Sequence, residues 1–99
     1  MTRHTSTLYA KLLGETARVE WQALQPFFAR GALLWVAPTL DLVAVAEAVA
    51  QDERAQVAAW LASGEVQSLC ASQAQGYVEA EPSLWAVVVS PWVLAQERP

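Results

Sequence analysis

The most apolar stretch of the chain is LWAVVVSPWVL, residues 84–94, and we expect the fold to be built around it. Three consecutive valines lie near its centre, and no charged residue occurs from Leu84 to Ala95. A strand with one face in water alternates polar and apolar residues. This stretch does not alternate, so both of its faces are expected to be buried. We therefore predict a central strand, which must bend or lose a partner at Pro91 because proline has no N–H to donate.

The rest of the chain switches repeatedly between helical and strand periodicity. Apolar residues three and four apart predict helices, whereas alternation and short apolar runs predict strands. Strands separated by helices favour parallel neighbours. We predict one α/β domain over residues 1–99, with helices covering a mixed or mostly parallel sheet of about four strands and flexible tails at 1–5 and 97–99. The predicted helices cover residues 8–13, 22–30, 41–62 and 72–80, and the predicted strands cover 16–21, 32–37, 65–70 and 84–89.

In two of the predicted helices, single residues affect where the helix begins or breaks. Asp41 is the best N-cap in the chain, because its carboxylate can accept a free N–H of the first turn. The apolar stripe of 41–62 is interrupted near Asp52, so this segment forms either one bent helix or two short ones. We favour a break at residues 51–52, because Asp52 can cap a second helix. In the helix 22–30, Pro26 is tolerated only within the first turn.

The composition points away from several classes of protein. A hydrophobic fraction of 55% excludes intrinsic disorder. The net charge is −4 and the six Lys and Arg residues are scattered, so the clustered cations that nucleic acids and anionic membranes attract are absent. The longest uncharged apolar run is about a dozen residues, short of the ~20 that a membrane-spanning helix needs. A single cysteine and the lack of an apolar leader predict a cytoplasmic location.

The sequence offers no catalytic or metal-binding set. His4 is the only histidine and lies in a predicted tail, whereas zinc needs three or four convergent ligands. Cys70 lies in an alternating segment and is interpreted as a small core residue. The four glycines are separated, so no phosphate-binding loop exists. We therefore expect no metal and no cofactor, and the sequence points away from an enzyme.

Five tryptophans in 99 residues are the unusual feature of the composition. Tryptophan is enriched at the energetic centres of protein interfaces. Trp92 follows Pro91 and is expected to reach the surface, and Arg30, beside two phenylalanines at a helix end, is a second candidate contact. The first functional hypothesis is therefore a non-enzymatic protein-interaction module or small subunit, as a homodimer or against an unknown protein partner.

The alternative hypothesis is a small-molecule-binding protein or minor enzyme. Open α/β sheets bind ligands beyond the carboxyl ends of their strands. Asp41 follows the predicted strand 32–37, and Ser90 follows the predicted strand 84–89. If those strands are parallel, both side chains lie at the rim of one pocket.

Three stretches of the chain are distinctive: EWQALQPFFARG at residues 20–31, LDLV at 40–43 and LWAVVVSPWVLAQ at 84–96. In these stretches the chain resembles a family of small uncharacterised bacterial proteins, classed as a domain of unknown function. The resemblance extends over about residues 8–96 and implies a bacterial cytoplasmic protein. It carries no activity, cofactor or catalytic residue, so both functional hypotheses stay open.

Overall fold

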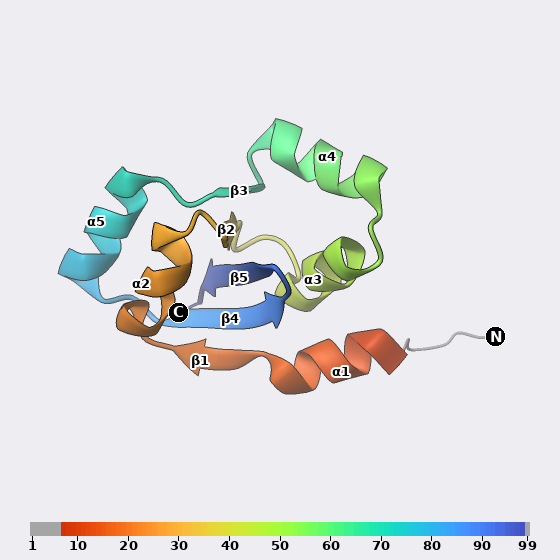
Figure 1. The fold of residues 1–99 in the computed structure, drawn as a ribbon, viewed down its shortest axis with the longest axis horizontal. Coiled ribbons are helices and arrows are strands. Elements are labelled where there is room, and N and C mark those ends of the chain that lie inside the picture. Colours follow the sequence, from red (N-terminus) through yellow and green to blue (C-terminus); the bar gives the residue numbers. More distant parts are fainter. Residues whose placement is uncertain (1–6, 99) are drawn as a thin grey trace.

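The computed structural model describes residues 7–98, which form a five-stranded sheet with helices on both faces (Figure 1). The predicted α/β class is confirmed. The helices are α1 (Thr7–Glu15), α2 (Trp21–Ala29), α3 (Leu42–Ala50), α4 (Arg54–Ser63) and α5 (Ala71–Ala80), and the strands are β1 (Ala17–Val19), β2 (Leu33–Val36), β3 (Val66–Ser68), β4 (Leu84–Val89) and β5 (Trp92–Glu97).

The sheet is mixed, and its strand order is β1-β4-β5-β2-β3. Within residues 7–98, β2 and β5 are the only parallel neighbours, and the other three neighbouring pairs are antiparallel. The prediction of a mixed sheet is therefore confirmed, with five strands in place of about four. Both edge strands, β1 and β3, have only three residues, which leaves little open backbone for pairing with another chain.

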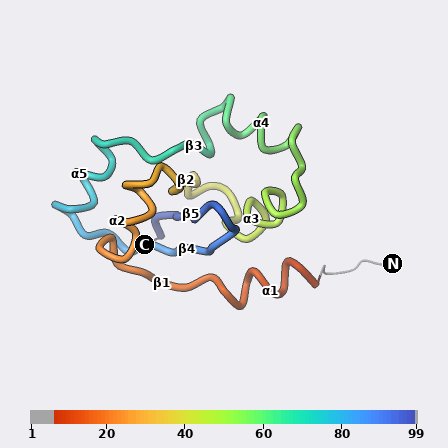
Figure 2. The backbone as a smooth tube through the Cα atoms, in the orientation of Figure 1, coloured from red at the N-terminus to blue at the C-terminus, as the bar shows by residue number. Residues whose placement is uncertain are grey.

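The apolar stretch that was predicted to form one central strand is instead a tight hairpin. β4 ends at Val89 and β5 begins at Trp92, and these two residues are partners across the turn (Figure 2). Ser90 and Pro91 form the turn, where a missing ladder N–H costs nothing. A two-residue connection makes the two strands antiparallel, and β5 rather than β4 becomes the middle strand of the sheet.

β5 continues into the segment for which the sequence predicts a flexible tail. Glu97 is the last residue of β5, and the Arg98 N–H donates to the Ser83 carbonyl oxygen at 3.0 Å. The predicted tail is therefore wrong for these two residues, because pairing along the hairpin carries the chain to its described end. The other predicted tail residues, 1–5 and 99, lie outside the described part of the chain.

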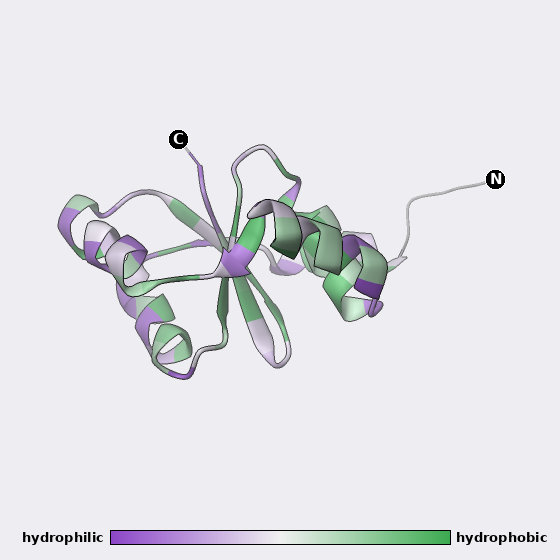
Figure 3. Cartoon of the chain, turned by 90° about the horizontal axis from the view of Figure 1, so that it is seen from above, coloured by the Kyte–Doolittle hydropathy of each residue, from purple (hydrophilic) through white to green (hydrophobic). Residues whose placement is uncertain are grey.

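Side chains alternate along the strands and divide the core into two layers. On one face, Val87 and Leu94 pack with α1 and α3, whereas on the other face Leu84 and Val93 pack with α2 and α5. The sheet lies between these two groups of helices in both Figure 1 and Figure 3. On β4, Val88 is 55% exposed and Trp85 is half-buried, so the predicted burial of both faces holds only for the other four residues of the strand.

Asp41 caps α3 as predicted, because its carboxylate accepts the Val43 N–H at 3.0 Å. The segment after it forms two helices, α3 and α4, with the predicted break between them. Asp52 does not cap the second helix, however. It has a left-handed φ of +56°, and its carboxylate pairs with Arg54 at 3.0 Å while Glu53 takes the N-cap position.

Pro26 lies in the second turn of α2. The prediction that a proline is tolerated here only within the first turn is therefore wrong. The helix begins at Trp21, where the sequence predicts the end of a strand, and this start places Pro26 further inside. Pro26 cannot donate to the Gln22 carbonyl. The helix nevertheless continues, since the Arg30 N–H still donates to the Pro26 carbonyl oxygen at 3.3 Å.

Among residues 7–98, no helix has the length and apolar character needed to cross a bilayer.

Candidate functional site: a groove between β1, α2 and α5

A groove of about 650 Å³ lies where β1 leads into α2 and where α5 ends. Three short segments form its walls: residues 18–20 of β1 and the turn after it, the first turns of α2, and residues 77–83 at the end of α5. Its polar lining consists of Arg18, Glu20, Gln22, Gln25, Glu81 and Ser83.

Local sequence explains why these segments meet. β1 has three residues and Glu20 immediately becomes the N-cap of α2, so the amino end of this helix opens onto the groove. The Glu20 side chain makes no capping hydrogen bond. At the other wall, α5 ends at Glu81, which has a left-handed φ of +48° and whose N–H donates to the Tyr77 carbonyl oxygen at 3.0 Å. Pro82 then prevents the helix from continuing.

Trp21 is the central side chain of the groove wall. It is only 8% exposed, and its ring lies 5.7 Å from the Phe28 ring and 5.5 Å from the Tyr77 ring, between centroids. Its indole Nε1 is buried and has no hydrogen-bond partner among the described residues. Burial of an unpaired donor costs about 1–3 kcal/mol, so this N–H lowers the free energy of unfolding.

The charged groups of the groove have both signs. Arg18 donates from Nη2 to Ser83 Oγ at 3.0 Å, which links β1 to the loop before β4. Glu20 and Glu81 contribute two carboxylates to the same lining. Burial raises the pKa of Tyr77 above its ordinary value, and the Glu97 carboxylate raises this pKa further, so Tyr77 stays a neutral phenol.

A second, shallower hollow of about 380 Å³ lies beside the groove, between α2 and α5. It shares Trp21, Gln25 and Val78 with the first, so the two hollows are adjacent. Its other walls include the Phe28 ring and the small side chains Ala29, Ala71 and Ala74. The site therefore has a polar end near β1 and an apolar end between the two helices.

The family model described as protein of unknown function (DUF2288) matches residues 7–97. The chain belongs to this family. Its fold is similar to the NMR solution structure of PA1075 from Pseudomonas aeruginosa, with a TM-score of 0.83 and 61% sequence identity. That likeness covers 100% of this chain and 92% of the PA1075 chain. No curated protein matches the chain. The resemblance to a bacterial family of unknown function is therefore confirmed, and the family description assigns no activity.

The predicted pocket rim of Asp41 and Ser90 does not exist, because the two residues lie at opposite ends of β5. The Gln96 side chain donates to the Leu40 carbonyl at 2.7 Å, which places Asp41 at the carboxyl end of β5. Ser90 precedes the amino end of the same six-residue strand, about 20 Å away at ~3.3 Å per residue. The prediction failed because β4 runs antiparallel to β5. Asp41 instead accepts hydrogen bonds from Val43 and from the Tyr9 hydroxyl, the latter at 2.6 Å.

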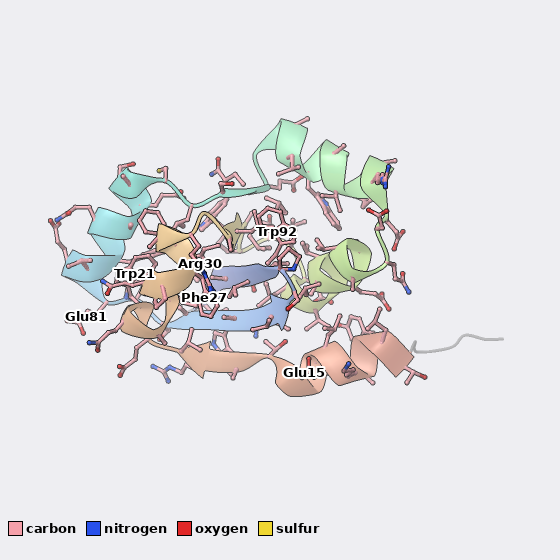
Figure 4. All side chains as sticks on the ribbon, in the orientation of Figure 1. Glu15, Trp21, Phe27, Arg30, Glu81 and Trp92 are labelled. Carbon is pink, nitrogen blue, oxygen red and sulfur yellow. The ribbon has the colours of Figure 1, made fainter. Side chains whose placement is uncertain are left out.

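Trp92 and Arg30, the predicted interaction residues, lie at the same end of the central strands but on opposite faces of the sheet (Figure 4). The Val93 N–H donates to the Ala32 carbonyl oxygen at 2.9 Å, which brings the end of α2 beside the start of β5. Val93 packs with α2, so the adjacent Trp92 points to the other face. Trp92 is 36% exposed, and the Arg30 guanidinium lies 4.9 Å from the centroid of the Phe27 ring.

The other residues singled out in the sequence are not part of the groove. His4 lies outside the described residues, and no group of three or more His, Cys, Asp or Glu side chains that could hold a metal occurs within residues 7–98. Cys70 was interpreted as a core residue, and this is wrong: it is exposed at the N-cap of α5. Hydrogen bonding to Ser72, with Sγ and Oγ 3.1 Å apart, and to the Gln73 N–H lowers the pKa of its thiol.

Alkylation of Cys70 by iodoacetamide should therefore reach half its maximal rate at a lower pH than that of a free cysteine, whose pKa is about 8.5. Mass-spectrometric rates from about pH 6 to pH 10 measure this midpoint. In Ser72→Ala the midpoint should move upward, since the hydroxyl that stabilises the thiolate is removed. A midpoint at or above that of a model thiol would contradict the hydrogen-bond geometry.

Proposed function

We propose that this chain is a non-enzymatic binding domain that holds a small ligand in the groove between β1, α2 and α5. The buried Trp21 N–H carries the proposal. Folded proteins pair nearly all of their buried polar groups, so the unpaired indole N–H of Trp21, a residue that lines the groove, fits a ligand acceptor that completes it. The groove volume of about 650 Å³ also falls within the ~300–1,000 Å³ of ligand pockets.

Binding accounts for the groove chemistry better than catalysis does. Ser83 is the hydroxyl nucleophile of the lining, and its described partner is Arg18, a cation that cannot take its proton. Tyr77 has a raised pKa and therefore cannot act as a base near neutral pH. The remaining polar groups can position a ligand by charge and hydrogen bonding.

We place this domain in the bacterial cytoplasm, because its single cysteine, Cys70, is free and exposed.

Thermal unfolding in the presence of amino acids, small carboxylic acids and primary amides tests the proposal. A compound at a hundred times its Kd stabilises a protein by about 2.7 kcal/mol, which corresponds to roughly 10 °C or more in Tm for a domain of this size. We expect at least one compound to raise the Tm of the wild-type protein and of Trp92→Phe, whose indole lies outside the groove. The same compound should have little effect on Trp21→Phe, which keeps a ring but lacks the N–H.

Without ligand, Trp21→Phe should change the free energy of unfolding by no more than about 1 kcal/mol. The smaller ring loses contacts with Phe28 and Tyr77, but the cost of the unpaired N–H disappears as well. Urea unfolding measures this difference. Equal ligand stabilisation in Trp21→Phe and the wild type, or no stabilising compound in the whole collection, would contradict the proposed function.

Self-association through Trp92 is a second candidate, favoured by the 36% exposure of this large ring beside the hairpin turn. Sedimentation velocity at micromolar concentration should then detect a dimer, and Trp92→Ala should shift it toward monomer. The other large exposed apolar side chains among the described residues lie on four different elements, which is why this candidate ranks second; they are Leu13, Leu61, Val78 and Val88. A wild-type protein that is strictly monomeric would remove this candidate.

A further inference from the structure

The donors at the polar end of the groove suit a carboxylate. α2 is a nine-residue helix, and the Glu20 side chain does not cap its amino end, where the Ala23 N–H donates to the Glu20 carbonyl oxygen at 3.0 Å. Arg18 adds a guanidinium to the same lining, and Trp21, which also lines the groove, has a buried indole N–H without a described partner. A carboxylate has two acceptor oxygens and can bind a cation, a helix terminus and a neutral donor together.

The two carboxylates of the lining require a positive charge on the same ligand. Glu20 and Glu81 outnumber Arg18 in the groove, so an anionic ligand without a cation would meet net repulsion. A ligand that also carries an ammonium group can satisfy an acidic side chain and the donors at once. The polar end therefore matches a molecule with both charges a few bonds apart.

The apolar end of the site suits a hydrocarbon or aromatic side chain. It lies beside the groove, shares Trp21 with it and is walled by Phe28, the alanines of α2 and α5 and Val78, which is 52% exposed. A ligand whose polar head lies against Arg18 can extend its apolar part into this hollow, since Trp21 and Gln25 border both parts.

Resting on the proposed function, we infer that the ligand is a free α-amino acid with an apolar side chain. Its carboxylate lies at the amino end of α2 with Arg18 and Trp21, and its ammonium group faces Glu81 and Glu20. Its side chain lies between α2 and α5. No covalent step is involved, so the role of the groove is recognition.

Isothermal titration calorimetry with three matched probes tests this inference: L-phenylalanine, phenethylamine, which lacks the carboxylate, and 3-phenylpropanoate, which lacks the ammonium group. L-Phenylalanine should bind, and each analogue should bind roughly tenfold or more weakly, because one charged hydrogen-bonding group is lost. Glycine, which lacks the apolar part, should also bind on the order of tenfold more weakly than L-phenylalanine.

Two variants test which side chain binds each charged group of the ligand, and a third serves as their control. Arg18→Gln should weaken L-phenylalanine binding about tenfold and leave phenethylamine binding unchanged, because this amine has no carboxylate. Glu81→Gln should weaken L-phenylalanine and phenethylamine binding but not 3-phenylpropanoate binding. Glu15→Gln is the matched control, since Glu15 is exposed at the end of α1, away from Trp21 and Glu81 (Figure 4). It should bind L-phenylalanine like the wild type.

The results separate this inference from the proposed function. If 3-phenylpropanoate or phenethylamine binds as tightly as L-phenylalanine, the inference of a ligand with both charges is overturned and the groove remains a binding site. The inference is also overturned if the Trp21-dependent compound from the thermal screen is not an amino acid. If no probe binds and no compound in that screen depends on Trp21, the proposed function itself fails.

Discussion

Replacing Leu94 by alanine is expected to lower the free energy of unfolding by about 4 kcal/mol. Leu94 lies on the middle strand and has no exposed surface. Its backbone neighbours on the two sides are Leu34 on β2 and Val87 on β4, so the cavity left by alanine opens between three strands and the helices above them. Such a site cannot collapse easily, which places the cost near the upper end of the range for leucine-to-alanine changes.

Urea unfolding followed by circular dichroism measures this loss, with Leu61→Ala as the control. Leu61 is 49% exposed on α4, so its truncation should cost less than about 1 kcal/mol. Small domains are stable by only about 5–15 kcal/mol, so Leu94→Ala should also lower the Tm by many degrees. Similar losses for the two variants would show that β5 is not the centre of the sheet.

Gln96→Leu should cost about 3 kcal/mol, although it adds an apolar side chain to an apolar core. Gln96 is only 2% exposed, and its Nε2 donates to the Ala37 and Leu40 carbonyl oxygens at 2.9 and 2.7 Å. Its Oε1 accepts from Arg98 Nε at 3.0 Å. The amide thus fastens the connection from β2 to α3 onto β5, and leucine leaves these carbonyls without their donor.

Gln96→Glu separates hydrogen bonding from packing. A carboxylate has nearly the same shape but cannot donate, and burial raises its folded-state pKa above the unfolded value of about 4.3. The destabilisation should therefore be fully present at neutral pH and should diminish as the pH falls toward the folded-state pKa, because the protonated group is neutral and can donate again. Gln67→Leu, at an exposed position on β3, should change stability by less than about 0.5 kcal/mol. A Gln96→Leu variant as stable as Gln67→Leu would contradict the buried bonds.

Much of the fold could be predicted because the bounds of several helices depend on nearby residues in the sequence. The carboxylate of Asp41 does cap α3, and the interruption at Asp52 does separate two helices. The hairpin at Ser90–Pro91 was missed, because a proline inside an apolar run is equally compatible with a bent strand and with a turn. Strand direction depends on this distinction, so the error also placed Asp41 and Ser90 at one rim.

The groove could not be predicted from the sequence for a different reason. Its walls come from residues 18–25 and 77–83, which share no motif and meet through tertiary contacts: the pairing of β1 with β4, the Arg18–Ser83 hydrogen bond and the packing of α2 with α5. Trp21 is the last residue of the predicted strand 16–21. In the structure it is buried at the start of a helix, and its N–H is unpaired among the described residues. The only local signal was that Glu20 precedes a helical stretch as an N-cap without a capping hydroxyl or Asp side chain.

The most direct test of ligand binding through Trp21 is the indole signal of this residue in a proton–nitrogen-15 correlation spectrum. The chain has five tryptophans, and the Trp21 signal is the one missing from Trp21→Phe. When the most stabilising compound of the thermal screen is added, the Trp21 signal should shift downfield as its N–H gains an acceptor, while the Trp92 signal should stay in place. A Trp21 signal that does not move at saturation would contradict the account.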